Sequence, residues 1–389
     1  MSTLKVNKIE STTSGGDCVV NATNKPGRNL IVNGAMQVAQ RGTSSTDNGY
    51  QTVDRMRLSR GGVNENPTQS QHALTSSDTG PWAKGFRYSY HILNGNQTSL
   101  DTDDRIYVEY RIEAQDLANS GWDYTSASSY ITLSFWAMSS VAQTFMGTLK
   151  TEDGTQQNYP FSFALSANTW TKVTKSIPGN SNIQIDNNND KGAIISINPY
   201  RGTNYSDSGV SLNTWAAYAG GTQFPDMTST WYSTDDSTFE FTGLQLEVGD
   251  TATDFEHRSY ADELQRSKRY FNMFANPASE TYSDDKGRQT LFSGMVWNKD
   301  TKDCRFSGSF DVAMRAAPSL YKVVGTSYFR IMVVGGANST SDWTLLGSWS
   351  NCFDIKCTAV DSFGTNDNGM AIYALCFNSA ARFGWNAEL

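Results

Sequence analysis

The stretch that most constrains the fold is Thr238–Val248, TFEFTGLQLEV. Its apolar residues alternate with polar ones, as in a half-buried strand, at Phe239, Phe241, Leu244, Leu246 and Val248. These positions are odd-numbered before Gly243 and even-numbered after it, so the buried face would change there. A strand changes its buried face only at a bulge or a sharp bend, and glycine suits both. The sequence therefore predicts a strand that is bulged or bent at Gly243.

A helical pattern follows this strand directly. From Ser259 onward, residues spaced three and four apart could share one helix face, namely Tyr260, Leu264, Ser267, Phe271 and Phe274. We expect a helix over Ser259–Phe274 that ends at Asn276-Pro277. This face has two interpretations: the helix packs on its own domain, or Tyr260, Leu264, Phe271 and Phe274 form the seam of a homotrimer. Two heptads do not decide between them.

The rest of the chain is rich in short strand patterns separated by clusters of Asn, Gly, Ser and Asp. This spacing is typical of mainly β proteins, so we expect an antiparallel jelly roll or β-sandwich over residues 29–257. The linker helix would then occupy 258–276, and a second antiparallel β-domain 277–389. Strict alternation at the C-terminus, in Ala381–Leu389, predicts a final strand that is paired in a sheet.

Residues 1–28 contain a candidate hairpin, Ser2–Ala22, with a TTSGG turn. An isolated two-stranded hairpin is marginal in water and needs a packing partner. It is either an extra hairpin on the neighbouring domain or an arm that attaches the chain to another protein.

Composition excludes several classes of function. The formal net charge is −8 and no run of Lys or Arg exists, which argues against nucleic-acid binding. No stretch approaches the roughly 20 apolar residues of a membrane span, and Met1–Gly16 lacks the apolar segment of a signal peptide. The five cysteines form no CxxC pair, so we expect buried thiols in a protein that folds in a reducing cytosol.

No catalytic motif is present. The three histidines, His72, His91 and His257, have no metal-ligand spacing, and neither a GxSxG elbow nor a P-loop occurs. Glycoside hydrolysis needs only two suitably spaced carboxylates, and acidic residues are too plentiful to be diagnostic. We therefore expect a protein that is not an enzyme, with a polysaccharide depolymerase as an alternative.

Aromatic residues in polar loops are the best candidates for ligand binding. Tyr and Trp rings stack on the apolar faces of sugars, while neighbouring polar groups bind the hydroxyls. The candidate glycan-binding residues are Trp82, Trp122, Tyr124, Tyr200, Arg201, Tyr205, Trp215 and Tyr218. Trp136 and Trp170 lie in strand patterns instead, and we expect them in the core.

One loop resembles the start of a calcium-binding loop. Asp186, Asn188 and Asp190 place oxygen ligands at alternate positions, but Ile197 stands where an EF-hand has its bidentate Glu. A solvated Asn-rich turn is the stronger interpretation, and a structural calcium ion is the alternative. No other cofactor or metal is expected.

Four segments carry a resemblance to known proteins. They are MSTLKVNKIESTTSGG, NLIVNGAMQVAQRG with VDRMRLS, GLQLEVGDTATDFEHRSYADELQRSKRYF, and AMRAAPSL with the terminal NAEL. Together they resemble bacteriophage tail-fibre and related virion proteins that contain a jelly roll similar to carbohydrate-binding modules.

The resemblance implies a virion protein that is assembled in the host cytoplasm and often trimeric. Its N-terminal arm would bind other virion proteins, and its jelly roll would bind host surface polysaccharide. A capsid or head appendage with no glycan ligand is the first alternative, and the depolymerase is the second.

Overall fold

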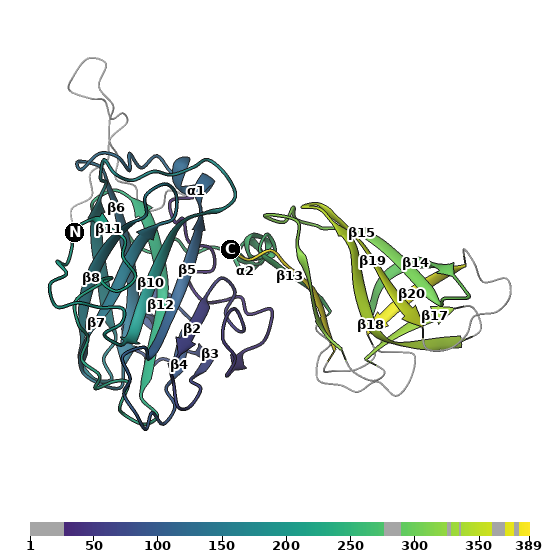
Figure 1. Ribbon diagram of the computed structural model, residues 1–389, viewed down its shortest axis with the longest axis horizontal. Coiled ribbons are helices and arrows are strands. Elements are labelled where there is room, and N and C mark those ends of the chain that lie inside the picture. The colour runs from purple at the N-terminus through teal and green to yellow at the C-terminus, as the bar shows by residue number, and fades with distance from the viewer. Residues whose placement is uncertain (1–26, 276–288, 325–327, 334–335, 360–369, 377–380) are drawn as a thin grey trace, which may run out of the picture.

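The computed structural model describes residues 27–275, 289–324, 328–333, 336–359, 370–376 and 381–389. The candidate arm at Ser2–Ala22 lies outside these residues. In the described chain no helix is long and apolar enough to cross a membrane. Figure 1 shows two β-domains, with the short helix α2 between them.

The N-terminal domain is an antiparallel sandwich of two six-stranded sheets, which confirms the jelly-roll prediction (Figure 1). The first sheet, sheet A, has the strand order β1 (Ser44–Ser45), β3 (Thr68–Ala73), β4 (Tyr88–Leu93), β12 (Thr238–Val248), β6 (Tyr130–Ser139) and β9 (Thr171–Pro178). The second, sheet B, has the order β11 (Ala216–Ala217), β8 (Gln157–Leu165), β7 (Gln143–Thr151), β10 (Lys191–Arg201), β5 (Arg105–Glu113) and β2 (Arg57–Gly61). Two short helical turns, η1 (Trp82–Lys84) and α1 (Ala114–Ala118), complete the domain.

The inner faces of the two sheets form one continuous core. Sheet B shows the period-two alternation clearly: in β5, Ile106, Val108 and Tyr110 are buried, while Tyr107 and Glu109 between them are half-exposed. This alternation leaves a polar outer face on sheet B.

The predicted bulge at Gly243 is confirmed. The pairing of β12 with β6 shifts register between Thr242 and Gln245, and Gly243 has a φ of +67°. A Cβ at Gly243 would lie 2.5 Å from Cζ of Phe86. Both the left-handed backbone and the close aromatic ring therefore require glycine here.

The helix prediction is correct in its start and wrong in its end. Helix α2 spans Tyr260–Lys268, and the Ser259 hydroxyl caps it by accepting from the Asp262 amide. Its buried residues are Glu263 and Ser267, whereas Tyr260 is 56% exposed. The helix therefore packs through a polar face and not through the apolar spacing that the sequence suggested.

Phe271 and Phe274 do not belong to the helix at all. They lie in strand β13 (Phe271–Ala275), which pairs with β21 (Arg382–Asn386). Phe271 is fully buried and Phe274 packs against the core of the C-terminal domain. The proposed trimer seam loses these two residues, because burial within their own chain already accounts for both rings.

The C-terminal domain combines a barrel with a small sheet. The barrel closes in the order β14 (Gln289–Asn298), β15 (Asp303–Ser309), β19 (Cys352–Ala359), β18 (Gly336–Ser348), β17 (Phe329–Val333) and β20 (Ala371–Cys376). The three-stranded sheet holds β21 between β13 and β16 (Ser319–Val323), which confirms that the C-terminal strand is paired. Cys304 and Cys357 are buried free thiols in neighbouring strands of the barrel.

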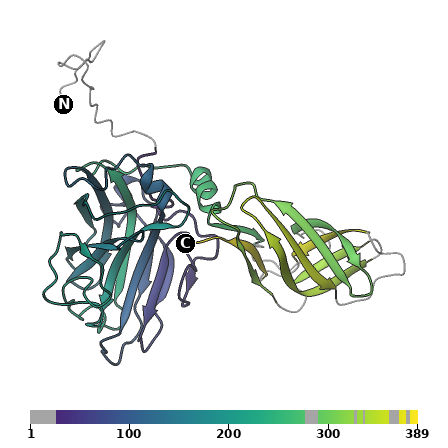
Figure 2. The same ribbon diagram turned by 45° about the horizontal axis from the view of Figure 1, so that its top comes forward.

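The C-terminus returns to the N-terminal domain, as Figure 2 shows. Both Arg41 and Arg55 form ion pairs with Glu388, the former at 3.4 Å. The carbonyl of the final residue, Leu389, accepts from Tyr50 and Arg111. The last two residues therefore fasten the two domains together.

Helix α2 and the segments around it complete this junction. Arg269 donates twice to Glu113, at 2.8 Å each, and Arg315 donates to the carbonyl of Asn189 at 2.6 Å. Glu263 accepts from the amide of Asn33 at 2.7 Å. Residues from three of the four segments that resemble virion proteins lie at this junction, so those three segments build the contact between the domains.

Candidate functional site

The outer face of sheet B carries a polar groove of about 270 Å³. Strands β5, β7 and β10 form its floor, and the chain that follows β10 contributes Tyr205, Tyr218 and Gln223 to its wall. Its lining combines aromatic, amide and charged side chains: Arg105, Tyr107, Glu109, Thr148, Lys150, Ile194, Ser196, Arg201, Tyr205, Tyr218 and Gln223. We call this the sheet B groove.

Arg201 is the central side chain of the sheet B groove. It is only 6% exposed, and its guanidinium lies 3.5 Å from the ring centroid of Tyr107. Its Nη1 donates to Gln223 at 2.6 Å and its Nη2 to Ser196 at 3.1 Å. Burial lowers the pKa of Arg201 from its ordinary value, and nearby groups, Glu109 among them, oppose this shift without reversing it.

Three tyrosines line the groove beside the cations. Arg105 donates to the hydroxyl of Tyr205, and the ammonium of Lys150 lies 4.3 Å from the ring centroid of Tyr218. Lys150 also pairs with Glu152 at 2.6 Å. The groove therefore presents aromatic rings together with fixed hydrogen-bond donors, a combination suited to a saccharide.

The one acidic residue of the groove is already neutralised. Glu109 accepts from Arg57 at 3.2 Å and from Arg111 at 2.9 Å. The charge that the groove offers to a ligand is therefore positive, although the whole chain is acidic.

The structure brings together three of the eight predicted glycan-binding residues: Arg201, Tyr205 and Tyr218. Two of the others are buried, which corrects their assignment. Trp122 is 4% exposed within the core, and Tyr200 stacks on Tyr232 at 4.5 Å between centroids. A ring covered on both sides by its own chain offers no face to a sugar.

Tyr124 and Trp215 are half-buried and pack against the sandwich core. The indole of Trp215 donates to the carbonyl of Pro178 at 2.7 Å, and its ring lies 5.2 Å from that of Tyr159. Both rings close the sandwich and lie outside the lining of the groove.

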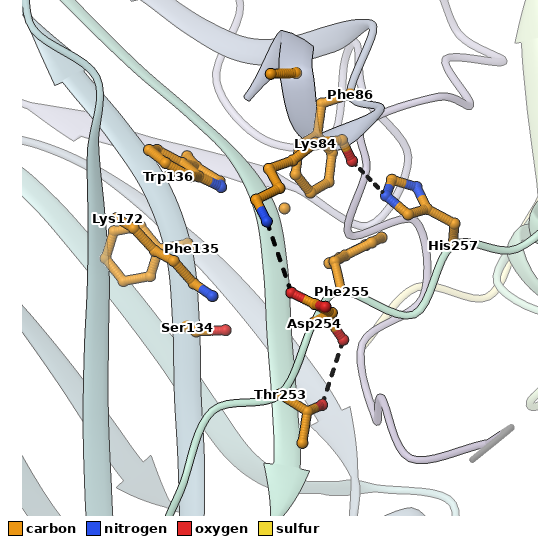
Figure 3. Close-up of a pocket in the computed structure, with 12 residues that line it drawn as sticks. Lys84, Phe86, Ser134, Phe135, Trp136, Lys172, Thr253, Asp254, Phe255 and His257 are labelled. Carbon is orange, nitrogen blue, oxygen red and sulfur yellow. Dashed lines mark hydrogen bonds and ion pairs between the residues drawn. The ribbon is translucent and has the colours of Figure 1, made fainter. Parts of the chain in front are cut away.

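A second pocket, of about 290 Å³, lies on the outer face of sheet A (Figure 3). Its walls come from β6, the 82–86 turn and the 253–257 segment that leads to α2. Lys84 and Asp254 face one another in it at 3.9 Å, and His257 binds the Lys84 carbonyl at 2.8 Å (Figure 3). We call this the sheet A pocket.

The aromatic rings around the sheet A pocket pack mainly against one another. Phe86 contacts both Phe255 and His257, with centroids 4.8 and 5.1 Å apart. This mutual packing anchors the 253–257 segment on sheet A. The pocket is therefore explained by local structure, without a ligand.

The predicted residue Trp82 belongs to this side of the molecule, where Arg87 lies 3.8 Å from its ring centroid. Trp136 and Trp170 are also here, half-buried on the outer face, so placing them in the core was wrong. They share strand patterns with core residues but point the other way, because the outer face of sheet A carries its own small apolar cluster.

The candidate calcium loop makes hydrogen bonds within the protein. The side-chain oxygen of Asn188 accepts from the Asp190 amide at 2.9 Å, and the carbonyls of both residues accept from the first amides of α1. Asp186 donates its amide to Asp153 at 2.9 Å. Over the described residues, no group of three or more His, Cys, Asp or Glu is arranged to hold a metal. Calcium binding by Asp186, Asn188 and Asp190 stays a prediction.

No family model and no curated protein matches this chain. Among solved structures, a family 4 carbohydrate-binding module is similar at 13% identity and a TM-score of 0.28, covering 56% of this chain and 98% of its own. The cellulose-binding domain of Cellulomonas fimi β-1,4-glucanase C is similar at 12% identity and a TM-score of 0.26, covering 55% of this chain and 100% of its own. A family 11 carbohydrate-binding module from Clostridium thermocellum is similar at 11% identity and a TM-score of 0.25, covering 55% of this chain and 98% of its own. Scores this low do not bear on the ligand of this chain.

The sequence interpretation missed several residues that line the groove, namely Arg105, Tyr107, Glu109, Lys150, Ser196 and Gln223. A signal for them exists in β5, RIYVEYRIE, where an apolar stripe alternates with Arg, Tyr and Glu. Their partners come from β7, β10 and a loop, which a single sequence does not align.

Proposed function

We propose that this protein is a non-enzymatic virion appendage, a tail fibre or similar, that recognises host surface glycan through the sheet B groove. The observation that carries the glycan part is the groove itself: tyrosine rings lie beside hydrogen-bond donors that packing holds in place. A rigid site of this kind binds a saccharide without first ordering its own side chains.

The virion part of the proposal is supported by the sequence segments that resemble phage proteins. Attachment through Ser2–Ala22, assembly in the host cytoplasm and trimerisation belong to the same proposal. Tyr260 and Leu264 remain available for contacts between chains, since one is exposed and the other half-buried. Light scattering on the full chain tests the trimer: a mass three times that of one chain supports it, and a monomer contradicts it.

A glycan array with the full-length chain tests glycan recognition. Tyr218→Ala removes a half-buried ring from the groove and should weaken binding about tenfold, the order expected for a lost aromatic contact. Tyr88→Ala is the matched control, because Tyr88 is an exposed tyrosine on sheet A, outside the groove.

Equal loss in both variants, or none in either, would contradict the assignment of the groove. Release of reducing ends from a bound polysaccharide would instead favour the depolymerase. A protein that binds no glycan but is incorporated into particles would favour a structural appendage.

A further inference from the structure

The described residues include three buried arginines, and they form a natural comparison: Arg41, Arg55 and Arg201. Each lies 3.5 Å from the centroid of an aromatic ring, those of Phe271, Tyr270 and Tyr107 respectively. The three guanidinium groups therefore have similar apolar surroundings.

They differ in their counter-charge. Arg41 and Arg55 both form ion pairs with Glu388. Arg201 has neutral hydrogen-bond partners, Gln223 and Ser196, and among the described residues no carboxylate lies within ion-pair distance of it. Its Nε is buried with no hydrogen-bond partner in that part of the chain, but the same holds for the Nε of Arg55, so the difference between them lies in the counter-charge.

A buried charge without a partner is costly, and folded proteins normally pair it. Arg201 differs from the junction arginines in lining an open groove. Arg105, on the same floor, likewise donates to neutral oxygens, the backbone carbonyl of Asp103 and the hydroxyl of Tyr205. Glu109 is the one carboxylate in the lining of the groove and raises the pKa of Arg201, but it forms its ion pairs with Arg57 and Arg111.

We propose that the sheet B groove selects acidic saccharides, with Arg201 and Arg105 binding an anionic substituent of the sugar. This inference rests on the proposed function and names its ligand class. The carboxylate of a uronic acid, a phosphate and a sulfate share the required chemistry, since each accepts charge-assisted hydrogen bonds from guanidinium groups.

The test uses the full-length chain and matched oligosaccharides. Oligogalacturonate and its methyl ester have the same backbone and differ in charge, and sulfated, phosphorylated and neutral oligosaccharides complete the array. We expect tighter binding to oligogalacturonate than to its ester by about tenfold or more, the usual worth of a hydrogen bond to a charged group. Affinity for the acidic ligand should also fall as salt rises.

The array outcomes separate the two proposals. Selective binding of a sulfated or phosphorylated sugar supports the anionic site and shows that the bound substituent is a sulfate or a phosphate, not a carboxylate. Equal binding of the acid and its ester, or preference for neutral sugars, overturns this inference and leaves glycan recognition standing. Binding to no member overturns both.

Three variants assign the effect to residues. Arg105→Gln changes a half-exposed side chain and should reduce binding of the acidic oligosaccharide while leaving the ester unchanged. Arg201→Gln should do the same more strongly, with its fold checked by melting. Arg87→Gln is the control, because Arg87 also lies over an aromatic ring, that of Trp82, but just before β4 of sheet A and outside the groove. If Arg105→Gln and Arg87→Gln behave alike, the anionic site is wrong.

Discussion

The domain junction and the sheet B groove are built from the same kinds of residue but differ in how their charges are balanced. At the junction, Arg41, Arg55 and Arg269 reach carboxylates of residues distant in sequence. In the groove, Arg201 and Arg105 reach only neutral oxygens among the described residues. At the junction these arginines form ion pairs with carboxylates, whereas in the groove the described residues provide no ion pair for Arg201 or Arg105.

This difference separates structural arginines from candidate binding residues. Breaking a complete buried ion pair damages the fold, because it leaves one charge alone. Changing an unpaired groove arginine should mainly change ligand binding. Three of the segments that resemble virion proteins lie at the junction, so a resemblance in those segments reports on architecture and says little about the ligand.

The largest expected effect is at Glu388, the shared partner of Arg41 and Arg55. Glu388→Gln should lower the free energy that couples the domains by about 3–5 kcal/mol, since two buried guanidinium groups lose their counter-charge. Calorimetry should then show the two domains melting separately.

Asp235→Asn is the control for that experiment, because Asp235 is an exposed acid for which the structure shows no ion pair. It removes the same charge and should leave the melting curve unchanged. If Glu388→Gln melts as the wild type does, the junction does not couple the domains.

A smaller effect comes from Asp54, whose burial raises its pKa to about 6. Its unfolded pKa is about 3.9, so between these values the folded state holds more protons. The free energy of unfolding should therefore fall as pH rises from about 4 to about 6, by up to roughly 3 kcal/mol from this group. Subtracting the Asp54→Asn curve from the wild-type curve isolates this change, and a flat difference would refute the buried ionisation.

A substitution at Gly243 tests the bulge, and its expected loss of stability is the smallest of the three. Gly243→Ala should destabilise by about 1–3 kcal/mol, because it combines a left-handed backbone with a clash against Phe86. Gly249→Ala is the control, since Gly249 also has a positive φ but open space where its Cβ would lie. Equal melting temperatures in the two variants would show that the contact with Phe86 is unimportant.

The sequence predicted those features that depend on local pattern. The period-two alternation predicted the strand at Thr238–Val248 and the paired strand at the C-terminus, and the change of buried face located the bulge at Gly243. It did not predict the end of α2, because Phe271 and Phe274 are spaced as on one helix face. Pairing with the distant β21, with a register shift between Met273 and Ala275, places them in a strand instead. Propensity and spacing do not contain such tertiary pairings.

The candidate site could be predicted only in part, for the same reason. Arg201, Tyr205 and Tyr218 lie within one stretch of sequence, which made them visible as a polar aromatic loop. Arg105 and Lys150 reach the groove from other strands of sheet B. Trp122 and Tyr200 look like loop aromatics in sequence, and only the packed core shows that they are buried.

The most direct test of the central claim is hydrogen–deuterium exchange of the full-length chain with and without oligogalacturonate, or whichever array member binds most tightly. We predict protection of backbone amides in and beside the groove, over residues 105–109, 148–150 and 194–223, with the 253–257 segment unchanged. Protection confined to 253–257 and 134–136 would place the ligand in the sheet A pocket and contradict the account.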